Sequence, residues 1–188
     1  MRVIGGEYRS RPLQSLQGLE LRPTSDRLRE TIFNVLAASA ALESSVWLDL
    51  FAGTGAVGIE AISRGARSVC FVESNRKHAR LIRENLKSLK IDAGFEVEEC
   101  EVASALRGLE ASGQQFDFCF LDPPYAMRGA YARTLEFLGK SKLVGESTIV
   151  IAEHEKKFGL EERYGSLARY RTLIQGDAGI SLFRRSSD

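Results

Sequence analysis

The sequence predicts an α/β protein with a Rossmann-like sheet, and two features carry this prediction. From about residue 45 onward, short apolar runs typical of strands alternate with stretches of helical periodicity. A glycine-rich turn follows the first apolar run, and Glu73 stands 20 residues after Gly53, the first glycine of that turn. This is the spacing of a nucleotide-binding βαβ unit. A mostly parallel sheet with helices on both faces follows from the alternation.

The first segment, residues 1–40, is expected to be an N-terminal extension to a main domain at residues 41–188. Gly5-Gly6 lies between short β-prone pieces and predicts a small hairpin over residues 1–13. A helix is expected to begin at Thr24 or Ser25, which can cap it. Its apolar face consists of Leu28, Ile32, Val35 and Leu36, with Arg27, Arg29 and Glu30 largely off that face.

The main domain is read as strands and helices in alternation, closed by a hairpin at the sheet edge. The expected strands are Val46–Phe51, Ser68–Glu73, Phe95–Glu98, Phe116–Leu121 and Thr148–Ala152. One helix is expected to begin at about Ala56. Three more are expected at Asn75–Leu89, near Ala103–Leu109 and near Ala130–Leu138. The closing hairpin pairs Tyr170–Gln175 with Ile180–Phe183.

Composition narrows the class of protein. The 188 residues suit one domain, and 26 basic against 25 acidic residues give a net charge of +1, so any nucleic-acid surface has to be local. Three cysteines without CxxC spacing and two distant histidines indicate reduced thiols and no metal site. With neither a signal-peptide pattern nor a long apolar run, we expect a cytoplasmic protein that does not enter a membrane. A monomer is the expected state.

The turn after the first strand is a candidate cofactor site. Gly53, Gly55 and Gly58 match G-x-G-x-x-G, and Glu73 can accept hydrogen bonds from ribose hydroxyls. Asp49, just before the turn, would repel a pyrophosphate and favour a ligand with an amino group. S-adenosylmethionine therefore fits better than NAD. The loop residues expected to contact it are Phe51, Ala52, Gly53, Thr54 and Gly55. After the third strand, Glu99 or Glu101 can face the adenine, and a solvated acidic loop is the other interpretation.

The end of the fourth strand carries Asp122-Pro123-Pro124-Tyr125. A planar exocyclic amine is a poor nucleophile, so a methylating protein must hold it in line with the methyl donor. Asp122 and the carbonyl of Pro123 can accept its two hydrogen bonds, Pro124 fixes the backbone, and Tyr125 offers a face for a base. Positioning and the charge of the carboxylate both favour the reaction.

These motifs resemble those of amino-methyltransferases that modify adenine N6 or guanine N2. The N-terminal stretches narrow the resemblance: Arg2–Arg11 (RVIGGEYRSR) and Arg22–Asn34 (RPTSDRLRETIFN) look like the opening of the bacterial 16S rRNA guanine-N2 methyltransferase family (RsmD type). The likeness covers essentially the whole chain. It implies a seven-stranded methyltransferase sheet, S-adenosylmethionine as donor, and guanine N2 in 16S rRNA of the small ribosomal subunit or its assembly intermediate as acceptor.

By motif position, the resemblance also implies the roles of individual residues. The amine and base site is Asp122, Pro123, Pro124 and Tyr125, and the cofactor site includes Asp49, Gly53, Gly55 and Glu73. Glu101 stands where relatives often have Asp or Asn near the adenine. An RNA-holding role is expected for Arg2, Tyr8, Arg9, Arg11, Arg22 and Arg27. Residues 1–13 carry only 3 − 1 = +2 charges, which favours recognition of a shaped substrate over a short free oligonucleotide.

Three alternatives stay open at this point. The Asp-Pro-Pro-Tyr motif also permits methylation of adenine N6 or of DNA. The same fold without activity would make an rRNA-binding assembly factor. An NAD oxidoreductase would use the glycine turn but leaves Asp122–Tyr125 unexplained.

Overall fold

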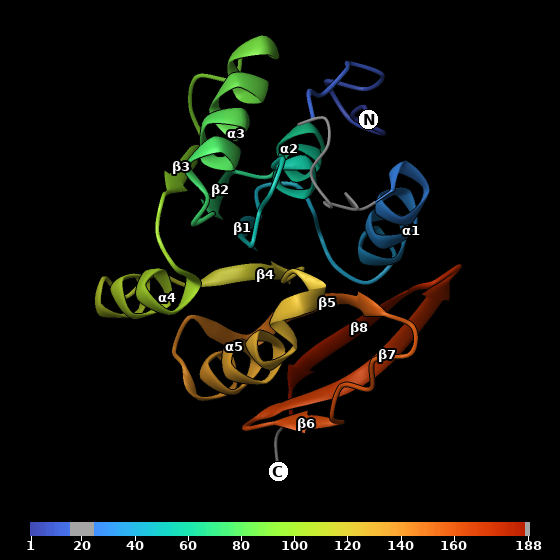
Figure 1. Ribbon diagram of the computed structural model, residues 1–188, viewed down its shortest axis with the longest axis vertical. Coiled ribbons are helices and arrows are strands. Elements are labelled where there is room, and N and C mark those ends of the chain that lie inside the picture. The colour runs from blue at the N-terminus through green and yellow to red at the C-terminus, as the bar shows by residue number, and fades with distance from the viewer. Residues whose placement is uncertain (16–24, 187–188) are drawn as a thin grey trace.

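One β-sheet forms the centre of the molecule (Figure 1). The structure is a computed structural model, and it describes residues 1–15 and 25–186. Within these residues the strand order is β3-β2-β1-β4-β5-β8-β7-β6. The strands are β1 (Val46–Leu50), β2 (Ser68–Val72), β3 (Phe95–Glu98), β4 (Phe116–Leu121), β5 (Val144–Glu155), β6 (Arg163–Tyr164), β7 (Leu167–Gln175) and β8 (Ala178–Arg185).

The predicted Rossmann-like class is confirmed, with one correction in strand number. Strands β3, β2, β1, β4 and β5 are mutually parallel, and β8 joins β5 in antiparallel register. The predicted closing hairpin is β7–β8. Across the described residues the sheet has eight strands instead of seven, because the two-residue β6 pairs with β7. A strand of two residues is too short to show alternating hydrophobicity, so the pattern could not reveal it.

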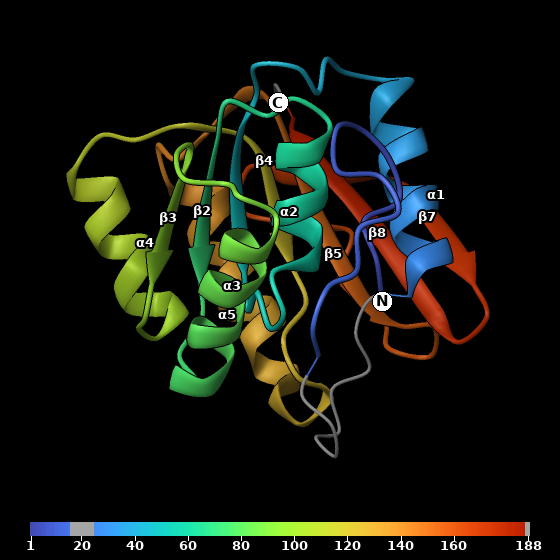
Figure 2. The same ribbon diagram turned by 90° about the horizontal axis from the view of Figure 1, so that it is seen from above.

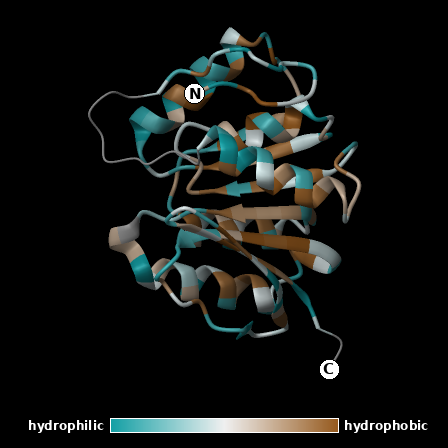
Figure 3. Ribbon diagram, turned by 90° about the vertical axis from the view of Figure 1, so that its right-hand side faces the viewer, coloured by the Kyte–Doolittle hydropathy of each residue, from teal (hydrophilic) through white to brown (hydrophobic). Residues whose placement is uncertain are grey.

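Alternating side chains of the central strands enter two separate cores. Trp47, Phe118 and Ile149 face one core, whereas Leu48 and Cys119 face the other. Because both faces are buried, these strands read as continuous apolar runs in the sequence. Figure 3 shows this hydrophobic colouring in the strands between the helical layers.

Helices cover both faces of the sheet, so the fold has three layers (Figure 1). The first core takes its helical residues from α1 (Asp26–Ala37), α2 (Ala56–Ser63) and α3 (Arg76–Ser88), and the second from α4 (Val102–Ala111) and α5 (Arg128–Lys140). A short 3-10 helix, η1 (Tyr125–Met127), precedes α5. In the described ranges, no helix is long and apolar enough to cross a membrane.

The N-terminal hairpin is less regular than predicted. The chain reverses so that Val3 N donates to Arg11 O and Leu13 N to Met1 O, but a single bridge, Arg2 to Pro12, replaces paired strands. The backbone at the tip is instead bound to α2, because Glu7 N donates to Ser63 O at 2.7 Å. Proline lacks the N–H that a longer ladder would need.

Helix α1 begins as predicted, but its buried face includes a charge. Ser25 is the N-cap, and its side chain accepts a hydrogen bond from Leu28 N at 3.2 Å. Arg29, expected off the apolar face, is fully buried. It donates to Asp26 at 2.9 Å and lies 3.7 Å from Glu60 of α2. Glu60 is far from Arg29 along the chain, which is why local periodicity placed Arg29 on the wrong face.

Candidate active site at the strand ends

Four carboxylates gather where the parallel strands end, an edge seen in the lower part of Figure 2. We call this group the acidic edge, consisting of Asp49, Glu73, Asp122 and Glu153. Strand register brings them together, since Leu50 pairs with both Val72 and Leu121, and Leu121 pairs with Ala152. In open parallel sheets, ligands bind at this edge.

The glycine turn leaves β1 in an unusual backbone conformation. Phe51 has a φ of +58°, followed by +55° at Gly53 and +75° at Gly55. A positive φ is costly for phenylalanine and is typical of functional sites. A Cβ placed on Gly53 would meet nothing closer than Phe51 O at 3.9 Å. The space above this turn is therefore open to a ligand.

Glu73 holds the turn in place. Its carboxylate accepts hydrogen bonds from Gly53 N and Asn75 N, both at 2.8 Å, and lies 3.7 Å from Nδ1 of His78. A second support comes from Asn85 of α3, which donates to Thr54 O at 3.1 Å and bonds to the backbone of Gln14. The turn, α3 and the N-terminal segment thus form one connected unit. The hydrogen-bonding role of Asn85 was missed from the sequence, where it lies among the apolar positions of a helix.

Asp49 lies beneath the turn and is only 1% exposed. Its carboxylate accepts a hydrogen bond from Gly58 N in the first turn of α2 at 2.9 Å. Burial raises the pKa of Asp49 to about 8, with the Gly58 hydrogen bond opposing the shift and the charge of Glu73 adding to it. Asp49 therefore lies in the wall of the site with its charged form disfavoured by burial.

Asp122 directly follows the last residue of β4. Its side chain accepts no hydrogen bond from any of the described residues. Burial raises its pKa well above the ordinary value, and the charges of Glu153 and Asp49 raise it further. Such a carboxyl is ready for a hydrogen-bond donor that a ligand would bring.

Glu153 is a site residue that the sequence analysis did not name. It is buried at the end of β5, and its backbone carbonyl accepts a hydrogen bond from the Tyr131 hydroxyl at 2.8 Å. The signal was present, because Glu153 directly follows the apolar run 148–152, just as Asp122 follows Phe116–Leu121.

The two prolines are held differently. Pro123 is buried, whereas Pro124 is exposed, with a φ of −51° and a ψ of 139°, and its carbonyl accepts a hydrogen bond from Met127 N at 2.7 Å. Tyr125 opens the 3-10 helix, and its side chain lies outside the described part of the structure. The rigid exit from β4 fixes the backbone around Asp122.

The two candidate glutamates after β3 have different environments. Glu99 pairs with Arg83 at 3.0 Å and Arg76 at 3.5 Å. Glu101 is exposed at the N-cap of α4, and its side chain caps nothing there. Of the two, Glu101 is the one left available for a ligand.

The described residues among those expected to hold RNA lie in three places. Arg2 and Arg27 are exposed near the start of α1, where Arg2 lies 3.8 Å from Asp26. Tyr8 and Arg9 lie at the tip of the N-terminal segment, beside Ser63 at the far end of α2. An eight-residue helix is about 12 Å long, so this tip lies well away from the glycine turn. Arg11 contacts the end of α3, and Arg22 lies outside the described residues.

Fold and strand-end motifs together define the class: the protein has the fold of the Rossmann-like methyltransferases. Two solved structures share it closely over nearly the whole chain. The Escherichia coli putative methyltransferase yhhF superposes with a TM-score of 0.83 at 29% identity, covering 100% of this chain and 99% of that one. The hypothetical protein TTHA0928 of Thermus thermophilus superposes with a TM-score of 0.84 at 30% identity, covering 97% of this chain and 98% of that one.

Sequence comparison then identifies the family. The model of the family described as Conserved hypothetical protein 95 matches residues 1–184, and the chain belongs to this family. The putative rRNA methyltransferase YlbH of Bacillus subtilis is 32% identical over 98% of this chain and 99% of its own. The ribosomal RNA small subunit methyltransferase D of Escherichia coli is 32% identical over 100% of this chain and 91% of its own. The family resemblance stated from the sequence is thereby confirmed.

Proposed function

We propose that the protein transfers a methyl group from S-adenosylmethionine to the exocyclic N2 of a guanine in 16S rRNA of the small ribosomal subunit. One observation carries the proposal: Asp122, in Asp-Pro-Pro-Tyr, stands at a strand end without a hydrogen-bond partner among the described residues, beside further carboxylates. The names of the two relatives support rRNA as the substrate. Guanine N2 rests on the family resemblance.

The donor set fits S-adenosylmethionine. Within the described residues, Asp49, Glu73 and Asp122 form no ion pair with a lysine or arginine. A ligand that carries an ammonium and a sulfonium would supply the missing positive charge. Glu73 and the open turn at Gly53 would hold its ribose and methionine parts, and Glu101 would lie toward its adenine. When bound, S-adenosylmethionine supplies the methyl group.

The chain itself positions the acceptor amine. Asp122 accepts a hydrogen bond from the NH2 group, the Pro123 carbonyl accepts the other, and Tyr125 stacks on the base. The raised pKa of Asp122 brings this carboxylate closer to the range in which it can take up the proton that the amine loses. A guanine can reach this position only when it is unstacked from its neighbours.

A methyl-transfer assay tests the proposal. The protein is incubated with labelled S-adenosylmethionine and either small ribosomal subunits or naked 16S rRNA from cells that lack the activity. We expect labelled N2-methylguanosine after digestion. Label in N6-methyladenosine would overturn the substrate and keep the amine chemistry. Absence of label from both substrates, with cofactor binding intact by calorimetry, would favour an RNA-binding assembly factor instead.

A further inference from the structure

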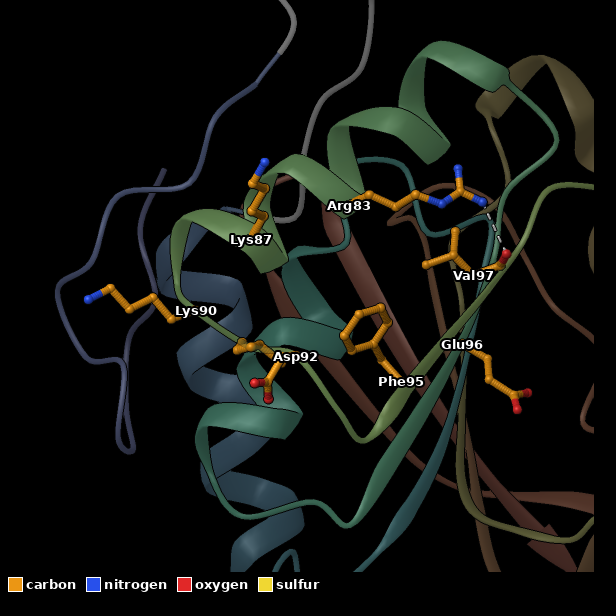
Figure 4. A pocket seen from close by; sticks show the side chains of 8 residues that line it. Arg83, Lys87, Lys90, Asp92, Phe95, Glu96 and Val97 are labelled. Atoms are coloured by element: carbon orange, nitrogen blue, oxygen red, sulfur yellow. Dashed lines mark hydrogen bonds between the residues drawn. The ribbon is translucent and has the colours of Figure 1, made fainter.

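A pocket of about 480 Å³ lies at the outer edge of the sheet, between α3 and β3 (Figure 4). Its lining includes Arg83, Lys87 and Lys90 from α3 and the residues after it, and Phe95 and Val97 from β3. Strands β2, β1 and β4 follow β3 in the sheet, so the pocket is three strand spacings from the strand that ends in Asp122. At about 4.8 Å per spacing, that is roughly 14 Å across the sheet.

The rim of the pocket carries two unpaired cations. Arg83 is engaged, because it donates to Glu99 at 3.0 Å and to Val97 O at 3.3 Å. The ammonium groups of Lys87 and Lys90 contact no acidic side chain or acceptor among the described residues. Figure 4 shows both lysines extending away from Phe95, on the side where the N-terminal segment runs. This arrangement leaves positive charge facing solvent beside an apolar surface.

The N-terminal segment contacts the end of α3, next to the pocket. Arg11 donates to Ser88 O, the last residue of α3, at 3.4 Å. Burial raises the pKa of Tyr8, and the nearby charges of Glu7 and of Asp92, a residue of the pocket, add to the shift. Tyr8 and Arg11 therefore border the same surface as Lys87 and Lys90.

The inner wall of the pocket is apolar and aromatic. Ile91 is buried, and the partly exposed Phe95 packs against the first core with one side (Figure 4). An aromatic ring next to cations is the combination with which proteins bind single-stranded nucleic acid, since the ring stacks on a base and the cations neutralise phosphates. The carboxylates of Asp92 and Glu96 at the rim can accept hydrogen bonds from base amines.

We propose that this pocket holds a nucleotide of the RNA substrate at a distance from the target guanine, with Lys87 and Lys90 on the backbone phosphates and Phe95 against the base. The inference rests on the proposed function, because it takes RNA as the substrate. It extends the RNA surface from the N-terminal segment to the β3 edge. Such a second contact compensates for the small charge of residues 1–13.

A double variant tests the phosphate contacts. Binding to naked 16S rRNA is measured against salt for Lys87→Ala/Lys90→Ala and for the control Lys140→Ala/Lys142→Ala. The control replaces the last residue of α5 and a lysine in the turn that follows it. Loss of two phosphate contacts reduces the slope of log K against log salt by about 1.4 to 1.8. We expect this change only in the first variant, with cofactor binding unaltered. Equal slopes in wild type and both variants would overturn the proposal.

A second variant tests the base contact. Phe95→Leu keeps an apolar side chain against the core but removes the aromatic face. We expect RNA affinity to fall at least about fivefold with an unchanged salt slope, as for loss of one stacked base, while the thermal unfolding midpoint verifies folding. Wild-type affinity in this variant would overturn the nucleotide pocket.

Comparing methyl transfer with binding separates this proposal from the proposed function. If the wild type methylates rRNA but RNA binding does not depend on Lys87 and Lys90, only the pocket inference fails. If binding depends on these lysines but no methylated nucleoside forms, only the proposed function fails. Normal binding to naked rRNA together with reduced methylation of assembled subunits would assign the surface to a ribosomal protein and overturn the RNA contact.

Discussion

Two carboxylates, Glu60 of α2 and Asp122 of the acidic edge, differ in how the fold compensates their charge. Glu60 of α2 is fully buried and saturated: it accepts from Ile4 N at 2.7 Å, Gly5 N at 2.8 Å and Arg64 Nε at 2.8 Å, with Arg29 at 3.7 Å. Asp122 of the acidic edge has no such partner among the described residues, and its neighbours are other acids.

We interpret this difference as one between a structural carboxylate, Glu60, and a candidate functional one, Asp122. Glu60 ties the N-terminal segment and α1 to α2, so its charge is compensated within the fold. Asp122 has no such compensation among the described residues, which destabilises its charged form. In the proposed function, its hydrogen-bond partner is the substrate amine. We expect changes at Glu60 to affect stability and changes at Asp122 to affect activity.

The largest effect is expected from Asp122→Asn. The variant loses the anionic acceptor, so methyl transfer should fall by about 100-fold or more. Its free energy of unfolding should stay equal or rise, since repulsion from Glu153 is removed. Activity assays and urea denaturation measure the two quantities, and calorimetry verifies cofactor binding. Turnover within a few-fold of wild type would refute the assigned role of Asp122.

Glu60→Ala should act on stability instead. Removing the carboxylate takes away the acceptor of two backbone donors and one of the acidic neighbours of the buried Arg29, which keeps Asp26. Breaking a buried ion pair costs about 3–5 kcal/mol. Urea denaturation checks this against Glu84→Ala, a control in which an exposed glutamate of α3 is lost. Equal stability of the two variants would show that the Glu60 contacts do not support the fold.

The pH dependence of stability sharpens the comparison at Asp49. Its pKa is about 4 in the unfolded chain and about 8 in the folded protein. The folded state then binds more protons between these values, so this group lowers the free energy of unfolding as pH rises from about 4 to about 8. The slope is at most about 1.4 kcal/mol per pH unit.

Asp49→Asn should remove this decline while the amide oxygen still accepts from Gly58 N. Urea denaturation of both proteins without cofactor, at a series of pH values, gives the difference. Parallel stability curves would mean that Asp49 does not change its pKa on folding.

The smallest effect is expected from an exposed pair that matches a buried one. Arg80 and Glu84 have the same sequence separation of four residues and the same 2.8 Å contact as Glu60 and Arg64, but their side chains are 82% and 42% exposed. A double-mutant cycle on Arg80 and Glu84 should give a coupling of about 0.3–0.5 kcal/mol. A coupling energy as large as that between Glu60 and Arg64 would show that burial does not strengthen the ion pair.

Much of the fold and part of the site were predictable because their signals are local. Strands 95–98 and 116–121 match the prediction residue for residue. The first alternates apolar and charged residues and the second is a mostly buried apolar run, and both patterns are local. The glycine turn and Asp122 were found by motif, and register then placed them at one edge. Glu153 carried the same strand-end signal and was overlooked.

The sequence by itself determined the order of strands and helices, the cap at Ser25 and the family, because periodicity, capping and motifs act over a few residues. Only the tertiary structure decided that Arg29 is buried against Glu60, that Asp122 and Glu153 are neighbours, and that the N-terminal segment borders α3. These contacts join residues 31 to 77 positions apart. Their burial and charge depend on which elements pack together, and no local pattern contains that information.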